Sequence, residues 1–332
     1  MKNNVQIISK LKDNQEESLA KPMIELRNLT KVFEKQTALN NVNLMIEEGD
    51  AFGFIGPNGA GKTTTIRILS TLLDPTGGEA FINGISVLDE PEEVRKIIGY
   101  MPDYFGVYDG MKVWEYLDFF AAAYRQPENR RKQLISDVLE LTDLTIKRET
   151  FIETLSMGMR QRLGVAKTLL NDPKVLILDE PASGLDPRAR IELKELLKEL
   201  TKMGKTIFIS SHILPELADI CNKIGIIESG SLLAFGTIDD FKENINAAKI
   251  RKIHVRSLDD TDKIFKALSN YSSVTGLEVH NGTVVIDFSG GLEEMSGLLE
   301  YLVNNKIRII EFLEKSANLE DIFMKITKGE IS

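Results

Sequence analysis

The amino-acid sequence predicts an α/β protein with a mainly parallel sheet, an antiparallel β subdomain and a helical insert, followed by a small α+β domain. Residues 51–55 are almost wholly apolar and precede a glycine-rich turn and the helical run 63–73. A strand buried on both faces with a helix behind it is typical of a parallel sheet. Helical periodicity dominates residues 100–170, and short strands and helices alternate beyond about residue 250.

The remaining elements of the larger domain follow from local patterns. Between residues 23 and 47 apolar and polar positions alternate, which is typical of half-exposed strands. After the helical insert the pattern predicts a strand at 175–178, a helix at 191–200, a strand at 206–210 and a hairpin at 224–234. The predicted helix is amphipathic, and its buried face is formed by Leu193, Leu196, Leu197 and Leu200.

These patterns divide the chain into three regions. Residues 1–22 lack the apolar core and cleavage site of a secretory signal, so we expect a flexible extension. Residues 23–245 are expected to form the main domain, with the helical insert at about 103–170. Residues 246–332 show the strand and helix order of a ferredoxin-like α+β unit, with one more helix expected at 319–328.

Composition and charge exclude several classes of protein. The formal charge of −9 over 332 residues argues against a dedicated nucleic-acid binder, which needs a basic face. The single cysteine, Cys221, cannot form an internal disulfide, and this indicates a cytoplasmic setting. No stretch reaches the roughly 18 consecutive apolar residues that a membrane-spanning helix requires.

A phosphate-binding motif lies between the strand at 51–55 and the helix that follows. Residues 56–63 fit the P-loop pattern G-x-x-x-x-G-K-[ST]. Its backbone N–H groups are expected to wrap a polyphosphate, Lys62 to reach the terminal phosphates, and the Thr63 hydroxyl to face Mg²⁺. The sequence thus predicts a P-loop NTPase sheet. The predicted phosphate-binding positions are Gly56, Pro57, Asn58, Gly59, Ala60, Gly61, Lys62, Thr63 and Thr64.

Two acidic residues follow the apolar strand at 175–178. Carboxyl ends of strands in an open α/β sheet are where ligands bind, so we expect Asp179 and Glu180 at that edge. Asp179 suits the coordination shell of Mg²⁺, and Glu180 is placed to deprotonate a water in line with the γ-phosphate. His212 follows the apolar strand at 206–211 and could donate a hydrogen bond to the same phosphate. Glu180, His212 and Lys62 are the predicted catalytic residues.

The segment 155–161 distinguishes among P-loop proteins. Its sequence, L-S-M-G-M-R-Q, resembles the signature of ABC ATPases in its L-S-x-G-x-x-Q form, about twenty residues before the Asp179 strand. A serine cap and exposed N–H groups at a helix start form a second anion site. The resemblance covers residues 23–236, and the C-terminal unit resembles the appendage of prokaryotic exporter-type ATPases.

The family resemblance implies a head-to-tail dimer with two ATP molecules between the subunits. It implies that Ser156 and Gly158 touch the γ-phosphate of ATP held by the partner, within a signature formed by Leu155, Ser156, Gly158 and Gln161. It also implies that Phe33 stacks on adenine, and that an interface loop, the D-loop, is formed by Ser183, Gly184, Leu185 and Asp186. One departure is Asp103, where the family carries a glutamine that contacts Mg²⁺ and water.

The implied function is that of the ATP-hydrolysing subunit of an ABC transporter, with ATP and Mg²⁺ as cofactors. A homodimer or paired ATPase subunit would work with separate transmembrane permease subunits on the inner face of the membrane, driving export. The alternative is a non-transport ABC ATPase that acts on ribosomes or DNA, and a degenerate binding module is a third class. A single cassette without long coiled coils disfavours the ribosome and chromosome types.

Aromatic residues are concentrated in the predicted insert. Between Tyr100 and Tyr124 lie 9 of the chain's 23 aromatic residues. A nucleic-acid stacking surface is disfavoured by the acidic composition. We expect part of the cluster to form the core of the insert, and the family resemblance implies a groove there for a short helix of the membrane subunit.

Overall fold

The computed structural model describes residues 22–34, 36–104, 106, 108, 110–241, 251–269, 271–280 and 282–315. Residues 1–21 of the extension expected at 1–22, Phe105 and the helix expected at 319–328 lie outside the described residues, whereas Pro22 already belongs to the first strand. The chain divides into two compact units, one ending at Ile238 and the next beginning at Asp239. This division precedes the boundary expected between residues 245 and 246, and each unit has its own hydrophobic core.

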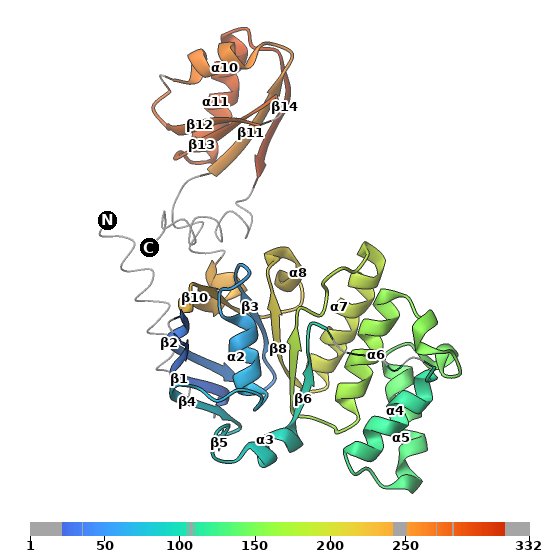
Figure 1. The fold of residues 1–332 in the computed structure, drawn as a ribbon. Helices are drawn as coiled ribbons and strands as arrows, with labels where there is room; N and C mark the ends of the chain where they lie inside the picture. Colours follow the sequence, from blue (N-terminus) through green and yellow to red (C-terminus); the bar gives the residue numbers. More distant parts are fainter. Residues whose placement is uncertain are drawn as a thin grey trace. The chain divides into compact units, whose positions relative to one another are not determined.

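A six-stranded sheet forms the centre of the first unit (Figure 1). In spatial order its strands are β10 (Ser231–Thr237), β9 (Lys223–Glu228), β3 (Ala51–Ile55), β8 (Thr206–Ser211), β7 (Val175–Asp179) and β6 (Ile98–Met101). All neighbours pair in parallel except β10 and β9. Every residue of β3, β7 and β8 is buried, as the apolar runs predict. Parallel pairing therefore brings the carboxyl ends of these three strands to one edge.

The antiparallel subdomain is a second sheet of the same unit. Its strand order is β2 (Gln36–Glu47), β1 (Pro22–Phe33), β4 (Gly77–Ile82) and β5 (Ile85–Ser86). The patterns at 23–47 predicted β1 and β2, whereas β4, β5 and helix α3 (Pro91–Ile97) are additional elements. One buried cluster joins the two sheets, with Ile24 from β1, Phe52 from β3 and Ile66 from α2 (Lys62–Leu69). This shared core fixes α2 behind the turn that follows β3.

The helical insert consists of α4 (Val113–Ala123), α5 (Glu128–Leu141) and α6 (Met157–Leu169), with 3₁₀ turns at Thr145–Lys147 and Ile152–Thr154. Figure 1 shows the three helices gathered on one side of the six-stranded sheet. Two further helices follow strands of that sheet: α7 (Pro187–Lys202) after β7 and α8 (Leu214–Ala218) after β8. The buried face of α7 consists of the four leucines predicted from the sequence, Leu193, Leu196, Leu197 and Leu200.

The second unit has the predicted order of strands and helices. Its elements are β11 (Arg251–Ser257), α10 (Thr261–Leu268), β12 (Val274–His280), β13 (Thr283–Phe288), α11 (Leu292–Asn304) and β14 (Ile309–Lys315). They form one antiparallel sheet in the order β12-β13-β11-β14, which is the split β-α-β arrangement of ferredoxin-like units. Ile264 and Leu298 from the two helices pack with Ile253 and Ile286 of the central strands.

Within the described part of the chain, no helix combines the length and the apolar character that a bilayer crossing demands.

Candidate functional site

The turn between β3 and α2 accepts only glycine at two of its positions. A Cβ atom on Gly56 would lie 2.2 Å from the backbone oxygen of Ile227. At Gly61, φ is +112° and a Cβ atom would lie 2.7 Å from Leu39. The backbone of the turn therefore packs closely against other strands of the same chain on its inner side. The N-terminus of α2 remains available to an anion. This cradle fits the phosphate groups that the motif predicts.

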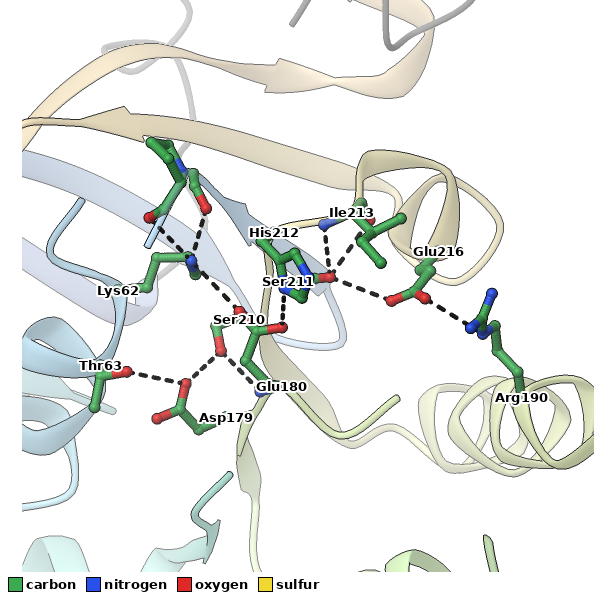
Figure 2. Close-up of polar contacts among 12 residues, drawn as sticks. Lys62, Thr63, Asp179, Glu180, Arg190, Ser210, Ser211, His212, Ile213 and Glu216 are labelled. Atoms are coloured by element: carbon green, nitrogen blue, oxygen red, sulfur yellow. Dashed lines mark hydrogen bonds and ion pairs between the residues drawn. The ribbon is translucent and has the colours of Figure 1, made fainter. Parts of the chain in front are cut away.

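Lys62 places a buried positive charge inside this turn. Its side chain is 6% exposed, and Nζ donates hydrogen bonds to the carbonyl oxygens of Gly56 at 2.6 Å and Pro57 at 3.3 Å. Nζ also lies 3.4 Å from Oε1 of Glu180 (Figure 2). The P-loop lysine and the acid after β7 thus meet, although they lie far apart in the sequence. A terminal phosphate bound in the turn would be adjacent to both groups.

Asp179 is held in place by a serine of the next strand. The ladder between β7 and β8 pairs Asp179 with Ser210. The Ser210 hydroxyl donates to Oδ1 of Asp179 at 2.6 Å and accepts from the backbone N–H of Glu180 at 2.9 Å. The Thr63 hydroxyl lies 3.5 Å from the same carboxylate oxygen. Since Mg²⁺ prefers oxygen ligands and one or two carboxylates, Thr63 and Asp179 suit a magnesium site that phosphates would complete.

Glu180 adopts a backbone conformation that is uncommon for a residue other than glycine. Its φ is +48°, and such conformations persist only where surrounding contacts hold them, most often at functional sites. Both oxygens of its carboxylate have a partner: Nζ of Lys62 lies 3.4 Å from Oε1, and Nδ1 of His212 lies 2.9 Å from Oε2. Figure 2 shows these contacts between residues that follow three different strands. The structure therefore brings the three predicted catalytic residues together.

Asp103 follows β6 and belongs to the same electrostatic environment. Partial burial raises the pKa of its carboxyl, and the negative charges of Asp179 and Glu180 raise this pKa further. Asp103, at the position where the resemblance implies a glutamine, therefore adds a third carboxylate to a site that already holds two. Its negative charge is disfavoured there unless a cation is bound.

The remaining family motifs have defined positions. Phe33 ends β1 and is 44% exposed, with Nζ of Lys31 over its ring at 5.0 Å. Ser156 is the N-cap of α6, and its hydroxyl accepts from the N–H of Met159 at 3.3 Å. Leu155 and Gln161 are buried within this chain. Burial within their own unit therefore argues against the direct contact of these two side chains with a partner's nucleotide that the resemblance implies.

Gly158 allows two helices of the same chain to approach closely. A Cβ atom at this position would lie 2.6 Å from the Cβ atom of Ala189 in α7. The adjacent D-loop packs against the start of α6, because a Cβ atom on Gly184 would lie 3.2 Å from Cε of Met157. Asp186 then caps α7 by accepting from the N–H of Ala189 at 2.9 Å. The signature and the D-loop thus form one continuous surface region.

The aromatic cluster of the insert is divided between core and surface. Tyr116 is fully buried, and burial raises its pKa. It stacks edge to face with Phe120 at 4.8 Å between ring centroids. Tyr108 and Phe119 also stack edge to face, at 5.7 Å, but both are about half exposed. Part of the cluster therefore forms the core, as expected, and part lies on the surface of the insert.

Ser210 joins Asp179 to the backbone of Glu180, and no motif in the sequence marks it as a site residue. Its position two residues before His212 was the available signal. The pairing of Asp179 with Ser210 depends on the register between β7 and β8, which no local pattern specifies. The same holds for Ser211, Glu216 and Arg190, which extend the polar network beyond His212 (Figure 2).

Two family models match the chain in succession. Residues 39–183 match the model described as ABC transporter. Residues 236–327 match the model of the C-terminal domain of DrrA1-3-like ATP-binding proteins. The two matches correspond to the nucleotide-binding unit and to the small α+β unit.

Solved structures similar to the chain belong to the same class. One is the ATP-binding subunit of an ABC transporter, with 31% identity, a TM-score of 0.61, and coverage of 68% of this chain and 93% of that one. Another is a dimeric post-hydrolysis state of the ATP-binding cassette MJ0796 bound to ADP and Pi. It has 28% identity and a TM-score of 0.59, and the match covers 65% of this chain and 99% of that one.

Curated relatives extend over both units. An uncharacterized ABC transporter ATP-binding protein, YhcH of Bacillus subtilis, is 36% identical over 92% of this chain and 96% of its own length. The bacitracin transport ATP-binding protein BcrA of Bacillus licheniformis is 34% identical over 92% of this chain and 98% of its own. The linearmycin resistance ATP-binding protein LnrL of Bacillus subtilis is 30% identical over 92% of this chain and 98% of its own length. The chain therefore belongs to the ABC transporter ATP-binding proteins and carries a C-terminal domain of the DrrA-like type.

Proposed function

We propose that this ATP-binding subunit hydrolyses ATP to ADP and phosphate, and that hydrolysis drives export through separate transmembrane subunits. The observation that carries the proposal is the position of the Glu180 carboxylate. It lies 3.4 Å from Nζ of Lys62 and 2.9 Å from Nδ1 of His212, at the edge where the P-loop ends. A base, a phosphate-binding cation and a polarising histidine thus converge on the place where a γ-phosphate would be held.

Glu180 acts in this proposal as the general base. It accepts a proton from a water while the water oxygen forms a bond to the γ-phosphorus and the bond from that phosphorus to the β–γ bridging oxygen breaks. His212 orients the Glu180 carboxylate and donates to the γ-phosphate. Lys62 and the backbone N–H groups of the P-loop stabilise the charge that develops on the phosphate oxygens. Phe33 stacks on the adenine.

Magnesium would be held by Thr63 and Asp179, with Asp103 as a further oxygen donor. When bound, the ion neutralises charge on the β- and γ-phosphates. The contribution of the chain is to fix the ligands: Ser210 binds Oδ1 of Asp179 at 2.6 Å, so the carboxylate cannot rotate away without breaking this hydrogen bond. The same serine ties the backbone of Glu180 to the metal ligand.

We further propose that two copies close head to tail over two ATP molecules. Ser156 is exposed at the N-terminus of α6, where unpaired backbone N–H groups favour an anion. In the dimer, Ser156 and the backbone at Gly158 contact the γ-phosphate held by the partner, and residues 183–186 cross the interface. A relative of known structure, the cassette MJ0796, was solved as a dimer with ADP and Pi, which supports this arrangement.

The membrane partners would bind the exposed aromatic residues of the insert, including Tyr108 and Phe119. The protein would then lie on the cytoplasmic face of the membrane, attached through its permease subunits. Relatives named for bacitracin transport, linearmycin resistance and Nod factor export support export as the direction. The transported molecule is selected by the membrane subunits.

The test compares phosphate release by the wild type and by Glu180→Gln, each purified from membranes together with its permease subunits. We expect Glu180→Gln to keep ATP binding and to lose hydrolysis by about 10²-fold or more, because the isosteric amide cannot accept the proton. The matched control is Glu278→Gln, which removes an exposed carboxylate from a His–Glu pair in the second unit. Normal turnover in Glu180→Gln would contradict the assignment of the base, and an inactive wild type would favour a binding module.

A further inference from the structure

Glu216 is a buried carboxylate that lies just after the His212 turn. Its side chain is 7% exposed in the short helix α8. One oxygen, Oε1, lies 3.3 Å from Nε of Arg190. This oxygen receives no aligned hydrogen bond among the described residues, so the Arg190 charge is what compensates it. A buried carboxylate without such a charge would be strongly destabilised.

Arg190 connects Glu216 to the D-loop. It lies in the first turn of α7, directly after residues 183–186, and its backbone N–H donates to the carbonyl oxygen of Asp186 at 3.0 Å. Its guanidinium Nη2 donates to the carbonyl oxygen of Leu185 at 3.3 Å. One guanidinium thus contacts both the D-loop backbone and the buried carboxylate.

Ser211 connects Glu216 to His212. The Ser211 hydroxyl lies 3.3 Å from Oε2 of Glu216 and accepts the backbone N–H of Ile213 at 3.0 Å. These contacts hold the turn on both sides of His212, whose ring reaches Glu180. Figure 2 shows an unbroken set of polar contacts from Arg190 through Glu216 to this turn.

We propose that Arg190 and Glu216 are positioning residues for hydrolysis, which couple the position of the D-loop to the orientation of His212. This inference rests on the proposed ATPase function and on the D-loop facing a second copy. When the Leu185 carbonyl moves on closure, the guanidinium follows, and the buried carboxylate moves with it because the charges cannot separate without loss of compensation. The Ser211 turn then holds the His212 ring in its contact with Glu180 while the site closes.

A merely structural pair between the two helices would behave differently. The chain offers a matched control, because Lys194 of α7 also pairs with Asp219, the residue that ends α8, at 2.6 Å. This second ion pair joins the same two helices but contacts neither the D-loop nor the His212 turn in the described structure. If the Arg190–Glu216 pair only held α7 and α8 together, then removing either ion pair should lower activity to the extent that it lowers the melting temperature.

The experiment measures kcat, KM for ATP, binding of a fluorescent ATP analogue and melting temperature in the full chain with its membrane subunits. The variants are Arg190→Met, Glu216→Gln, their double variant, Arg190→Lys and Lys194→Met. We expect Arg190→Met and Glu216→Gln to lower kcat by about tenfold or more with KM and analogue binding within about twofold. The double variant should lose little more than either single variant, because the residues act as one unit.

Two further comparisons separate positioning from folding. Arg190→Lys keeps the charge and should recover part of the lost kcat, and Lys194→Met should keep kcat within about twofold of the wild type. Wild-type kcat in Arg190→Met or Glu216→Gln would overturn the inference. The inference would also be overturned if the loss of kcat were proportional to the loss of melting temperature in every variant, including Lys194→Met. An inactive wild type would contradict the proposed ATPase itself, and the wild-type assay reveals this before any variant is compared.

Discussion

Nδ1 of His212 lies 2.9 Å from Oε2 of Glu180, although the two residues follow different strands. The contact depends on the parallel order β8-β7 in the centre of the sheet, which brings both carboxyl ends to one edge. It gives the proposed base a fixed direction, because Lys62 binds the other carboxylate oxygen. The geometry of hydrolysis is therefore set by long-range pairing of buried strands.

Replacement of this histidine should reduce turnover more than nucleotide binding. His212→Ala removes the group that orients Glu180 and donates to the phosphate, so we expect kcat to fall by about 10²-fold with little change in ATP affinity. The control is His280→Ala, which removes an exposed histidine paired with Glu278 at 3.0 Å in the second unit. Steady-state phosphate release checks both. Equal activity of the His212 and His280 variants would refute the role given to His212.

Loss of the Ser210 hydroxyl should affect both stability and activity. Ser210 is completely buried and bonds Asp179 and the Glu180 N–H. Ser210→Ala leaves the Glu180 N–H without this acceptor and leaves Oδ1 of Asp179 with only the long Thr63 contact at 3.5 Å. We therefore expect a loss of about 1–3 kcal/mol in the free energy of unfolding and a higher Mg²⁺ concentration for half-maximal hydrolysis.

The matched control is Ser70→Ala. Ser70 is also buried, but its hydroxyl finds no hydrogen-bond partner among the described residues. Its replacement should therefore cost less, as urea denaturation of the two variants can show. An equal loss in both variants would mean that the Ser210 contacts contribute nothing to stability.

The raised pKa of Asp103 predicts that the stability of the folded chain depends on pH. Its folded pKa is raised above its ordinary value of 3.8, mainly by burial and then by Asp179 and Glu180. The folded state therefore favours the protonated form, and this stabilisation is present below pH 3.8 and is lost as the pH rises through the raised pKa. Without nucleotide and Mg²⁺, Asp103→Asn should melt at a higher temperature than the wild type at pH 7, with a difference that shrinks toward acid pH.

The control for this comparison is Asp74→Asn, an exposed aspartate beyond the far end of α2. It removes the same charge from a solvated position and should leave the melting temperature nearly unchanged. A lower melting temperature for Asp103→Asn at pH 7 would show that the Asp103 charge is stabilised in the folded chain.

Local patterns were sufficient for the elements that carry the chemistry. The apolar runs at β3 and β7 and the P-loop between β3 and α2 placed Lys62, Asp179 and Glu180 correctly at element ends. They worked because strands buried on both faces leave a strong apolar signal and the glycine turn has a fixed spacing.

Other features could not be predicted, because they depend on contacts between distant segments. The register that pairs Asp179 with Ser210 joins residues 31 apart. β4 contains two glycines and β5 has only two residues, so neither leaves a clear alternating pattern. The close approach of Gly158 to Ala189 could not be predicted from the sequence either. This glycine of the signature motif thus has a packing role within its own chain.

This packing role decides how the composite site must be tested. A substitution at Gly158 would disturb α6 and α7 in the monomer, whereas Ser156 is exposed and its replacement removes only an N-cap contact worth about 1 kcal/mol. Ser156→Arg should therefore leave the fold and nucleotide binding intact while blocking closure over ATP.

The most direct measurement is the molar mass of the hydrolysis-blocked chain, Glu180→Gln, by light scattering with and without ATP. We predict that ATP converts this variant from monomer to dimer, and that Glu180→Gln with Ser156→Arg stays monomeric at the same ATP concentration while still binding the nucleotide. A Ser156→Arg double variant that dimerises normally, or a wild-type chain with Ser156→Arg that hydrolyses ATP at full rate, would contradict the claim that the reaction centre is completed by a second copy.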